Sequence, residues 1–175
     1  IQEAINVAGV GSTIHVEHGM YDPIMLNKSL TIIGESIDNT IIDGKGAETV
    51  VLITADNAYI RGFKIQNGDI GIKISNSKRN VVISNLITNN DRGVLLSDCS
   101  ESTIASNIIR NNNYGIALDL SSKSIITRNT ASNNFYGIDL RYSQNNTIAC
   151  NNIASNVNDG LRLYNCTQNV VMCNT

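Results

Sequence analysis

Residues 103–119 read TIASNIIRNNNYGIALD and residues 125–141 read IITRNTASNNFYGIDLR, so asparagine, glycine and branched apolar residues recur 22 positions apart. Glycine carries this period through most of the chain. One column consists of Gly71, Gly93, Gly115, Gly137 and Gly160, with spacings of 22, 22, 22 and 23 residues. A fixed period of this length is typical of solenoids, in which each repeat contacts only its neighbours.

Asparagine keeps the same phase in three further columns. The first contains Asn85, Asn107, Asn129, Asn151 and Asn174; the second contains Asn67, Asn90, Asn112, Asn134 and Asn156; the third, which also includes serine, contains Asn57, Asn80, Ser102, Ser124, Asn146 and Asn169. Asparagine tolerates a left-handed bend, and its amide can hydrogen-bond to the same amide one repeat away. We therefore expect these columns to form stacked ladders or left-handed bends.

Each repeat contains three short apolar segments. After the glycine, apolar residues alternate with period two, as in Ile116/Leu118 and Ile138/Leu140, which is typical of a half-buried strand. The other two segments lie on either side of the Asn107 column. Strands this short can pair in parallel with the same strand of the next repeat. The sequence therefore predicts an all-β parallel β-helix of about seven coils with a 22–23-residue repeat.

The chain is expected to be a single β-helix domain in three parts. Residues 1–12 have apolar residues at helical spacing and predict a short capping helix, because a solenoid end exposes unpaired strand edges. Residues 13–56 predict irregular first coils, and residues 57–175 predict the regular asparagine-ladder coils. The last residues begin another coil, so we expect the solenoid to continue in a longer protein.

Composition and charge argue against a nucleic-acid partner and against membrane insertion. The 175 residues carry a formal net charge of −2 and include 26 asparagines and 26 isoleucines. So small a net charge gives no reason to expect a nucleic-acid partner. No run of 18 apolar residues occurs, so we expect no membrane insertion.

The sequence resembles a known family in three N-terminal segments and in the Asn-x-x-Ile-x-x-Asn coils that follow them. The segments are IQEAINVAGVGSTIHVEHGMYD (1–22), LNKSLTIIGE (26–35) and TIIDGKG (40–46). The chain resembles right-handed parallel β-helix repeat proteins of the NosD/carbohydrate-binding-and-hydrolase type, over essentially its whole length. The resemblance implies a right-handed β-helix and a secreted or surface protein of archaea or bacteria. The fold also hosts pectate lyases, polygalacturonases, alginate epimerases and adhesins, so it does not select an activity.

The NosD name suggests copper, but the residues do not. His15 and His18 are the only histidines, one in a predicted strand and one in the loop after it, with no cysteine nearby. We therefore expect neither a metal site nor a cofactor.

A charged patch is predicted on the outward face of the strand that follows each glycine. In-register stacking would place Asp119 beside Arg141, and Asp139 beside Arg162. Asp119 and Asp139 would then be diagonal neighbours in adjacent coils. Two carboxylates about 5–10 Å apart could act as acid and base in a polysaccharide lyase or hydrolase, with an arginine that binds a uronate carboxylate. Alternatively, the four residues are cross-strand ion pairs. We favour ion pairs, because the unbroken repeat leaves no loop to enclose a cleft.

Tyrosines accompany this patch. Tyr114 and Tyr136 share the column before the glycine, and Tyr142 and Tyr164 lie near the charged residues. Exposed tyrosines at a repeated step can stack on sugar rings, or they can form an aromatic ladder that only stabilises the sheet.

Two of the four cysteines are candidates for a disulfide. Cys150 and Cys173 share a column in successive coils, about 5 Å apart at their Cα atoms, which lies inside the disulfide range. Cys99 and Cys166 also share a column but are three coils apart, too far to bond.

The sequence thus predicts a secreted or cell-surface β-helix module with a structural or carbohydrate-binding role, without catalysis. The expected partner is a polysaccharide or cell-envelope glycan, and the open end of the solenoid allows end-to-end self-association. The alternative is a polysaccharide lyase or hydrolase that acts on the outward face of one sheet.

Overall fold

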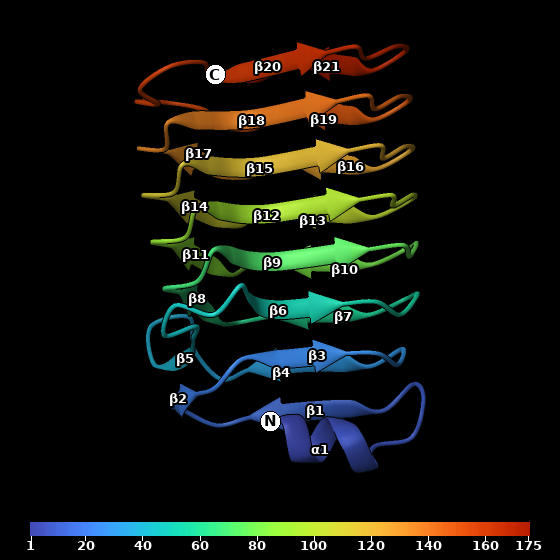
Figure 1. The fold of residues 1–175 in the computed structure, drawn as a ribbon, viewed down its shortest axis with the longest axis vertical. Helices are drawn as coiled ribbons and strands as arrows, with labels where there is room; N and C mark the ends of the chain where they lie inside the picture. Colours follow the sequence, from blue (N-terminus) through green and yellow to red (C-terminus); the bar gives the residue numbers. More distant parts are fainter.

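Three short strands and three bends make up each repeat, and the coils stack along one axis (Figure 1). The computed structural model describes residues 1–175 as a right-handed parallel β-helix of about seven turns with one short helix at the N-terminus, α1 (Gln2–Val7). The predicted fold class is therefore confirmed.

Strands pair in parallel with the equivalent strands of the neighbouring coils, on both sides except at the two ends of each sheet, which gives three sheets. Sheet A consists of β1 (Thr13–Val16), β4 (Thr31–Gly34), β7 (Tyr59–Arg61), β10 (Val81–Ile83), β13 (Thr103–Ala105), β16 (Ile125–Thr127), β19 (Thr147–Ala149) and β21 (Val170–Met172). Sheet B consists of β2 (Gly19–Tyr21), β5 (Thr40–Asp43), β8 (Lys64–Gln66), β11 (Leu86–Thr88), β14 (Ile108–Arg110) and β17 (Thr130–Ser132). Sheet C consists of β3 (Ile24–Leu26), β6 (Thr49–Ile53), β9 (Ile70–Ser75), β12 (Arg92–Ser97), β15 (Tyr114–Asp119), β18 (Tyr136–Arg141) and β20 (Leu161–Tyr164).

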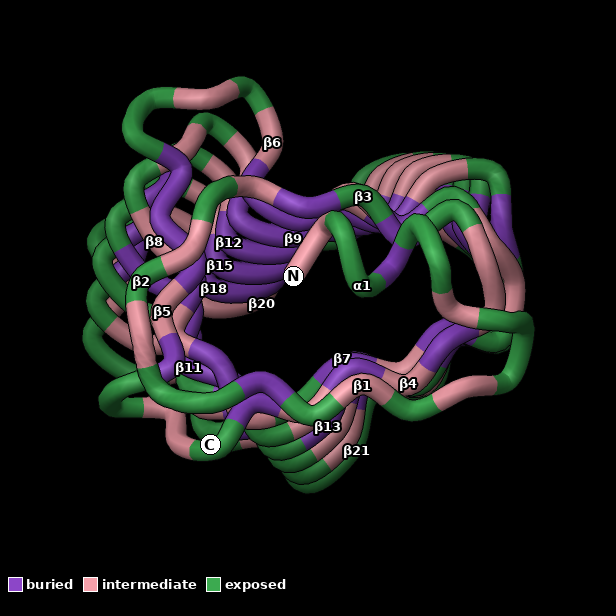
Figure 2. Tube along the Cα trace, turned by 90° about the horizontal axis from the view of Figure 1, so that it is seen from below, coloured by how far each residue is buried: buried purple, intermediate pink, exposed green.

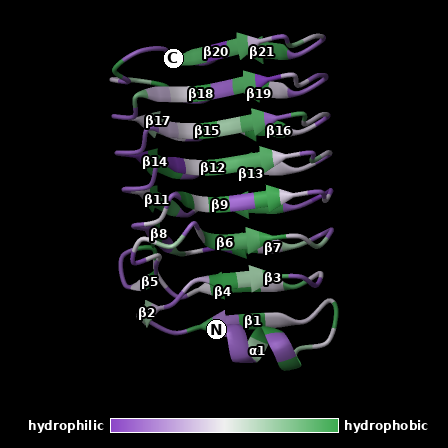
Figure 3. Cartoon of the chain, viewed as in Figure 1, coloured by the Kyte–Doolittle hydropathy of each residue, from purple (hydrophilic) through white to green (hydrophobic).

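The inward-facing side chains of all three sheets form one core. A cluster of 30 buried apolar residues, mostly isoleucine, valine and leucine, runs along the axis from Ile5 to Ile148. Figure 2 shows buried residues, in purple, recurring at the same positions in successive coils, and Figure 3 shows that hydrophilic residues predominate in the bends. Branched apolar residues suit such short strands because their side chains pack against the same residue one coil away.

The glycine column stacks as the period predicts. A β-carbon on Gly115 would overlap the backbone carbonyl oxygen of Gly137 and would lie 2.9 Å from the side-chain nitrogen of Asn134. Glycine is therefore required here for close approach between coils and not for an unusual backbone angle.

The asparagine columns form buried ladders. Asn107 accepts hydrogen bonds from the backbone and side-chain nitrogens of Asn85 at 3.0 and 3.2 Å, and donates to Asn129 Oδ1 at 3.0 Å. The left-handed residue is the one immediately before each ladder residue, for example Ser106 with φ 54°. The ladder thus satisfies the backbone N–H groups that the left-handed bend takes out of the sheets.

The predicted columns are wrong by one residue where the ladders begin. The register pairs Asn67 with Asn89 and brings Gly68 to the ladder position, where its N–H donates to Asn90. Likewise, Ala58 and not Asn57 donates to the next ladder residue, Asn80. Both asparagines instead occupy the left-handed bend, with φ of 61° and 56°. The first position of a ladder needs only a backbone N–H, so a small residue suffices there.

Helix α1 lies across the N-terminal end of the solenoid (Figure 1), beside β3 (Figure 2). Ile5 is its one buried residue and belongs to the core. The ammonium group of Lys28 donates to the carbonyl oxygens of Ile5, Asn6 and Ala8 at 3.1, 2.8 and 3.1 Å. A six-residue helix is unstable by itself, so Lys28 is the group that fixes its C-terminal end.

The Lys28→Met variant is expected to lower the free energy of unfolding by about 1–2 kcal/mol, because three carbonyl groups lose a charged donor. Urea unfolding measures this loss, and faster amide exchange in residues 2–8 would locate it. Lys123→Met, which removes an exposed lysine without side-chain bonds, is the matched control. Equal effects of the two variants would contradict the role assigned to Lys28.

Candidate functional site

The outer face of sheet C carries, in its last coils, the predicted charged residues and tyrosines together with Arg92. β12 supplies Arg92; β15 supplies Tyr114 and Asp119; β18 supplies Tyr136, Asp139 and Arg141; β20 supplies Arg162 and Tyr164; the bend after β18 supplies Tyr142. Parallel pairing sets Asp119 opposite Arg141. It also sets Asp139 opposite Arg162. Both juxtapositions agree with the register expected from the repeat.

Asp139 is the centre of this arrangement. It stands at an outward-facing position, yet only 2% of it is exposed. Arg162 donates from Nε to Oδ1 at 2.7 Å and from Nη2 to Oδ2 at 2.8 Å. Arg141, on the same strand, donates from Nε to Oδ2 at 2.9 Å. A fork of charge-assisted bonds is the strongest class of protein hydrogen bond, so Asp139 fixes the positions of both guanidinium groups.

The protonated, cationic form of Arg141 and of Arg162 is stabilised by neighbouring groups. Burial works to lower the pKa of Arg141, but the Asp139 carboxylate and the Tyr114 hydroxyl together outweigh it, and the pKa lies above its ordinary value. Hydrogen bonds to Asp139 are the largest cause that raises the pKa of Arg162. Both side chains are therefore cationic at neutral pH.

Two of the four tyrosines hold the arginines in place. Tyr114 and Tyr136 stack with ring centroids 5.0 Å apart, and the guanidinium carbon of Arg162 lies 3.9 Å from the centroid of Tyr136. Arg92 and Arg141 each lie 5.6 Å from the centroid of Tyr114, and Arg141 Nη2 donates to its hydroxyl at 3.4 Å. Arginine guanidinium groups thus lie over the rings of both tyrosines.

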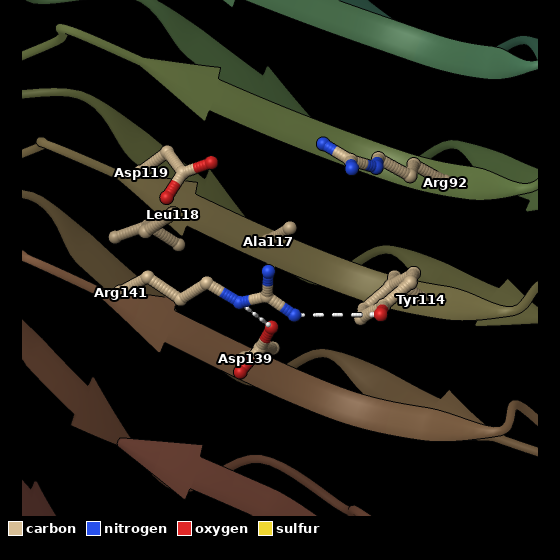
Figure 4. Close-up of a pocket in the computed structure, with 7 residues that line it drawn as sticks. All are labelled: Arg92, Tyr114, Ala117, Leu118, Asp119, Asp139 and Arg141. Carbon is tan, nitrogen blue, oxygen red and sulfur yellow. Dashed lines mark hydrogen bonds and ion pairs between the residues drawn. The ribbon is translucent and has the colours of Figure 1, made fainter. Parts of the chain in front are cut away.

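Asp119 is the free carboxylate of the patch. Its side chain makes neither an ion pair nor a hydrogen bond, because the guanidinium of Arg141 turns toward Asp139 and Tyr114 (Figure 4). The hollow that Asp119 shares with Arg92 and Arg141 has a volume of about 10 Å³. That volume suits at most one water molecule and cannot admit a sugar.

A larger groove lies beside the hollow, at the edge of sheet C. Arg141, Tyr142, Arg162 and Tyr164 line it, and its volume is about 290 Å³. Tyr142 and Tyr164 are 53% and 54% exposed, and their rings meet edge to face with centroids 5.7 Å apart. The groove thus combines two accessible aromatic rings with two fixed cations, and its size approaches that of small-molecule sites, about 300–1,000 Å³.

Arg92 is the one member of the patch that the sequence analysis missed. Arg92 lies immediately before Gly93 and so falls outside the outward positions that follow each glycine. Its register partner is Tyr114, whose own partner is Tyr136. Tyr114 and Tyr136 already define the column before the glycine, and extending that column by one coil leads to Arg92.

Cys150 and Cys173 occupy equivalent positions directly after β19 and β21. All four cysteines are free thiols, and these two are exposed. The N–H of Cys150 donates to the carbonyl oxygen of Met172 at 3.1 Å, which places the two cysteines on neighbouring coils in register. Neighbouring strands lie about 4.8 Å apart, inside the range of Cα separations in disulfides.

We expect oxidation to join Cys150 to Cys173. The oxidised chain would then gain the mass of two hydrogens on reduction, and a peptide map would contain the linked pair. Cys99 serves as the internal control: it is buried, and burial raises the pKa of its thiol, so it should resist alkylation until the chain unfolds. An intact mass that reduction leaves unchanged would contradict this prediction.

The histidines lie far from the patch, at the N-terminal end of the solenoid. His18 Nδ1 is 3.3 Å from Glu35 Oε2, and the His18 backbone N–H donates to the same oxygen at 2.8 Å. The backbone bond is the main reason why the pKa of Glu35 is lowered. His15 stands on β1 without a side-chain bond.

No helix of the molecule is both long and apolar enough to cross a lipid bilayer.

Several solved structures share the fold. Pectate lyase Pel9A superposes with a TM-score of 0.78 at 15% identity, over 89% of this chain and 48% of that one, so the chain spans about half the length of that enzyme. The A-module of the mannuronan C-5 epimerase AlgE4 from Azotobacter vinelandii gives a TM-score of 0.61 at 14% identity, over 99% and 71% of the two chains. Alginate lyase from Paenibacillus sp. str. FPU-7 gives 0.57 at 13% identity, over 97% and 95%. Identities this low show a common fold only.

A search of the curated proteins finds no match. A family model described as "Periplasmic copper-binding protein (NosD)" matches residues 5–175. The residues present do not fit a copper centre, since nowhere do three His, Cys, Asp or Glu side chains come together at metal-binding distance. The match itself covers nearly the whole chain, and the protein belongs to the NosD family.

Proposed function

We propose that this β-helix is a glycan-binding module that works outside the cytoplasm, and that the groove of Arg141, Tyr142, Arg162 and Tyr164 is its binding surface. The observation that carries the proposal is the pair of half-exposed tyrosines beside two fixed guanidinium groups in a groove of about 290 Å³. Sugar rings present flat apolar faces and hydroxyl oxygens, which suit aromatic rings and N–H donors respectively.

Two findings from related proteins support the proposal. The fold neighbours include a pectate lyase, an alginate lyase and a mannuronan epimerase, whose names all refer to polysaccharides. The description of the family is periplasmic, which agrees with a site of action beyond the inner membrane.

The geometry favours binding over catalysis. Both oxygens of Asp139 accept hydrogen bonds from arginines, so this carboxylate has no unoccupied oxygen to present to a substrate as an acid or base. Asp119 is free, but it lies in the small hollow and does not line the groove. The only space that the two carboxylates share is this hollow, which is too small to hold a glycosidic bond between them.

The test is a set of polysaccharides, including pectate, alginate and neutral glycans, in which binding and cleavage are measured in the same samples. We expect binding without cleavage, and a loss of about tenfold or more in affinity when Tyr142 and Tyr164 are both replaced by alanine. Tyr59→Ala is the matched control, because Tyr59 is half-buried on the outer face of sheet A. Cleavage of any polymer, or binding that the double variant leaves unchanged, would overturn the proposal.

A further inference from the structure

We infer that the groove selects acidic glycans: an anionic group on a sugar is bound by Arg141 and Arg162 while a ring of the same chain contacts Tyr142 and Tyr164. The inference rests on the proposed function and adds the chemical class of the ligand.

Unused hydrogen-bond donors are the first argument. Each guanidinium carries five N–H donors in a planar fork. Arg162 uses Nε and Nη2 for Asp139, and Arg141 uses Nε for Asp139 and Nη2 for the Tyr114 hydroxyl. Nη1 of both arginines is therefore unbonded within the chain. Donors of this kind pair best with planar or tetrahedral anions such as carboxylates and sulfates.

Charge balance is the second argument. Asp139 provides one negative charge against the two positive charges of Arg141 and Arg162, and Asp139 itself is buried. One positive charge at the groove thus has no partner in contact with it. Asp119 is the other carboxylate nearby, but it makes no ion pair and lies in the adjoining hollow. Its field weakens the attraction for an anion without cancelling it.

Rigidity is the third argument. The fork of bonds to Asp139 and the 3.9 Å stack on Tyr136 hold Arg162 in one orientation. A cation that is already fixed loses little conformational entropy when an anion binds, so more of the interaction appears as affinity. A neutral sugar in the same groove would displace water from these donors without providing a charge in return.

The experiment compares polygalacturonate with its fully methyl-esterified form, which has the same rings without the charge. We expect the charged polymer to bind about tenfold more tightly at low salt, with a preference that shrinks as salt is raised. Dextran sulfate and dextran form a second pair, which separates a requirement for carboxylate from a requirement for any anion.

Three variants assign the preference to the groove. Arg141→Gln should abolish it, Asp119→Asn should strengthen it, and Arg110→Gln, which removes an exposed arginine on β14, should leave it unchanged. Urea unfolding of each variant shows that it is folded. Equal binding of the charged and esterified polymers, with tyrosine dependence retained, would overturn the inference and leave the proposed function standing. Absence of binding to all four polymers and to neutral glycans would overturn both.

Discussion

Replacement of Asn107 by alanine is expected to lower the free energy of unfolding by about 3–5 kcal/mol. The Asn107 side chain is buried and makes four hydrogen bonds, two as an acceptor from Asn85 and two as a donor to Val82 O and Asn129 Oδ1. Alanine leaves these partners inside the coil without bonds, and each such group costs about 1–3 kcal/mol when it is left unsatisfied. Urea unfolding of the two proteins measures the difference.

Two comparison variants sharpen this test. Asn113→Ala removes an exposed asparagine with a single side-chain bond, to Asp91, and should cost less than about 0.5 kcal/mol. Asn107→Ser should fall between the two, since the neighbouring ladder accommodates Ser102 and Ser124. A loss below about 1 kcal/mol in Asn107→Ala would show that the ladder is not a main source of stability.

Replacement of Arg162 by glutamine is expected to cost about 2–3 kcal/mol of stability. Asp139 is almost fully buried, and Arg162 supplies two of the three charged hydrogen bonds to it. The expected loss is smaller than for an isolated buried pair, because Arg141 remains and because Arg162 itself is 27% exposed. Thermal or urea unfolding at neutral pH provides the measurement.

The double variant Asp139→Asn/Arg162→Gln separates the ion pair from simple loss of packing. With no buried carboxylate left unpaired, it should be more stable than Arg162→Gln alone, with a coupling of about 1–3 kcal/mol. Arg141→Gln should cost less than Arg162→Gln, because only one bond to Asp139 is lost. Equal losses at the two arginines, or a double variant no more stable than the single one, would contradict the role of Asp139 as the anionic centre.

Much of the candidate site could be predicted from the repeat. Once the column of Gly115 and Gly137 sets the register, Asp119 must lie opposite Arg141, and Asp139 opposite Arg162. The repeat could not determine which carboxylate the guanidinium of Arg141 would contact. Two are within reach, one across the sheet and one on its own strand, and the choice depends on the Tyr114 hydroxyl and on the burial of Asp139.

The sequence by itself determined the period, the three strands per coil, the parallel pairing and the short helix at the N-terminus. These features follow from local preferences repeated in phase, and a wrong register would turn every apolar residue outward. Only the tertiary structure decided that Asn57 and Asn67 lie in bends, that Tyr114 and Tyr136 support arginines, and that Tyr142 and Tyr164 face a groove. Those outcomes depend on which side chains from several coils contact one another, and the repeat pattern does not determine that choice.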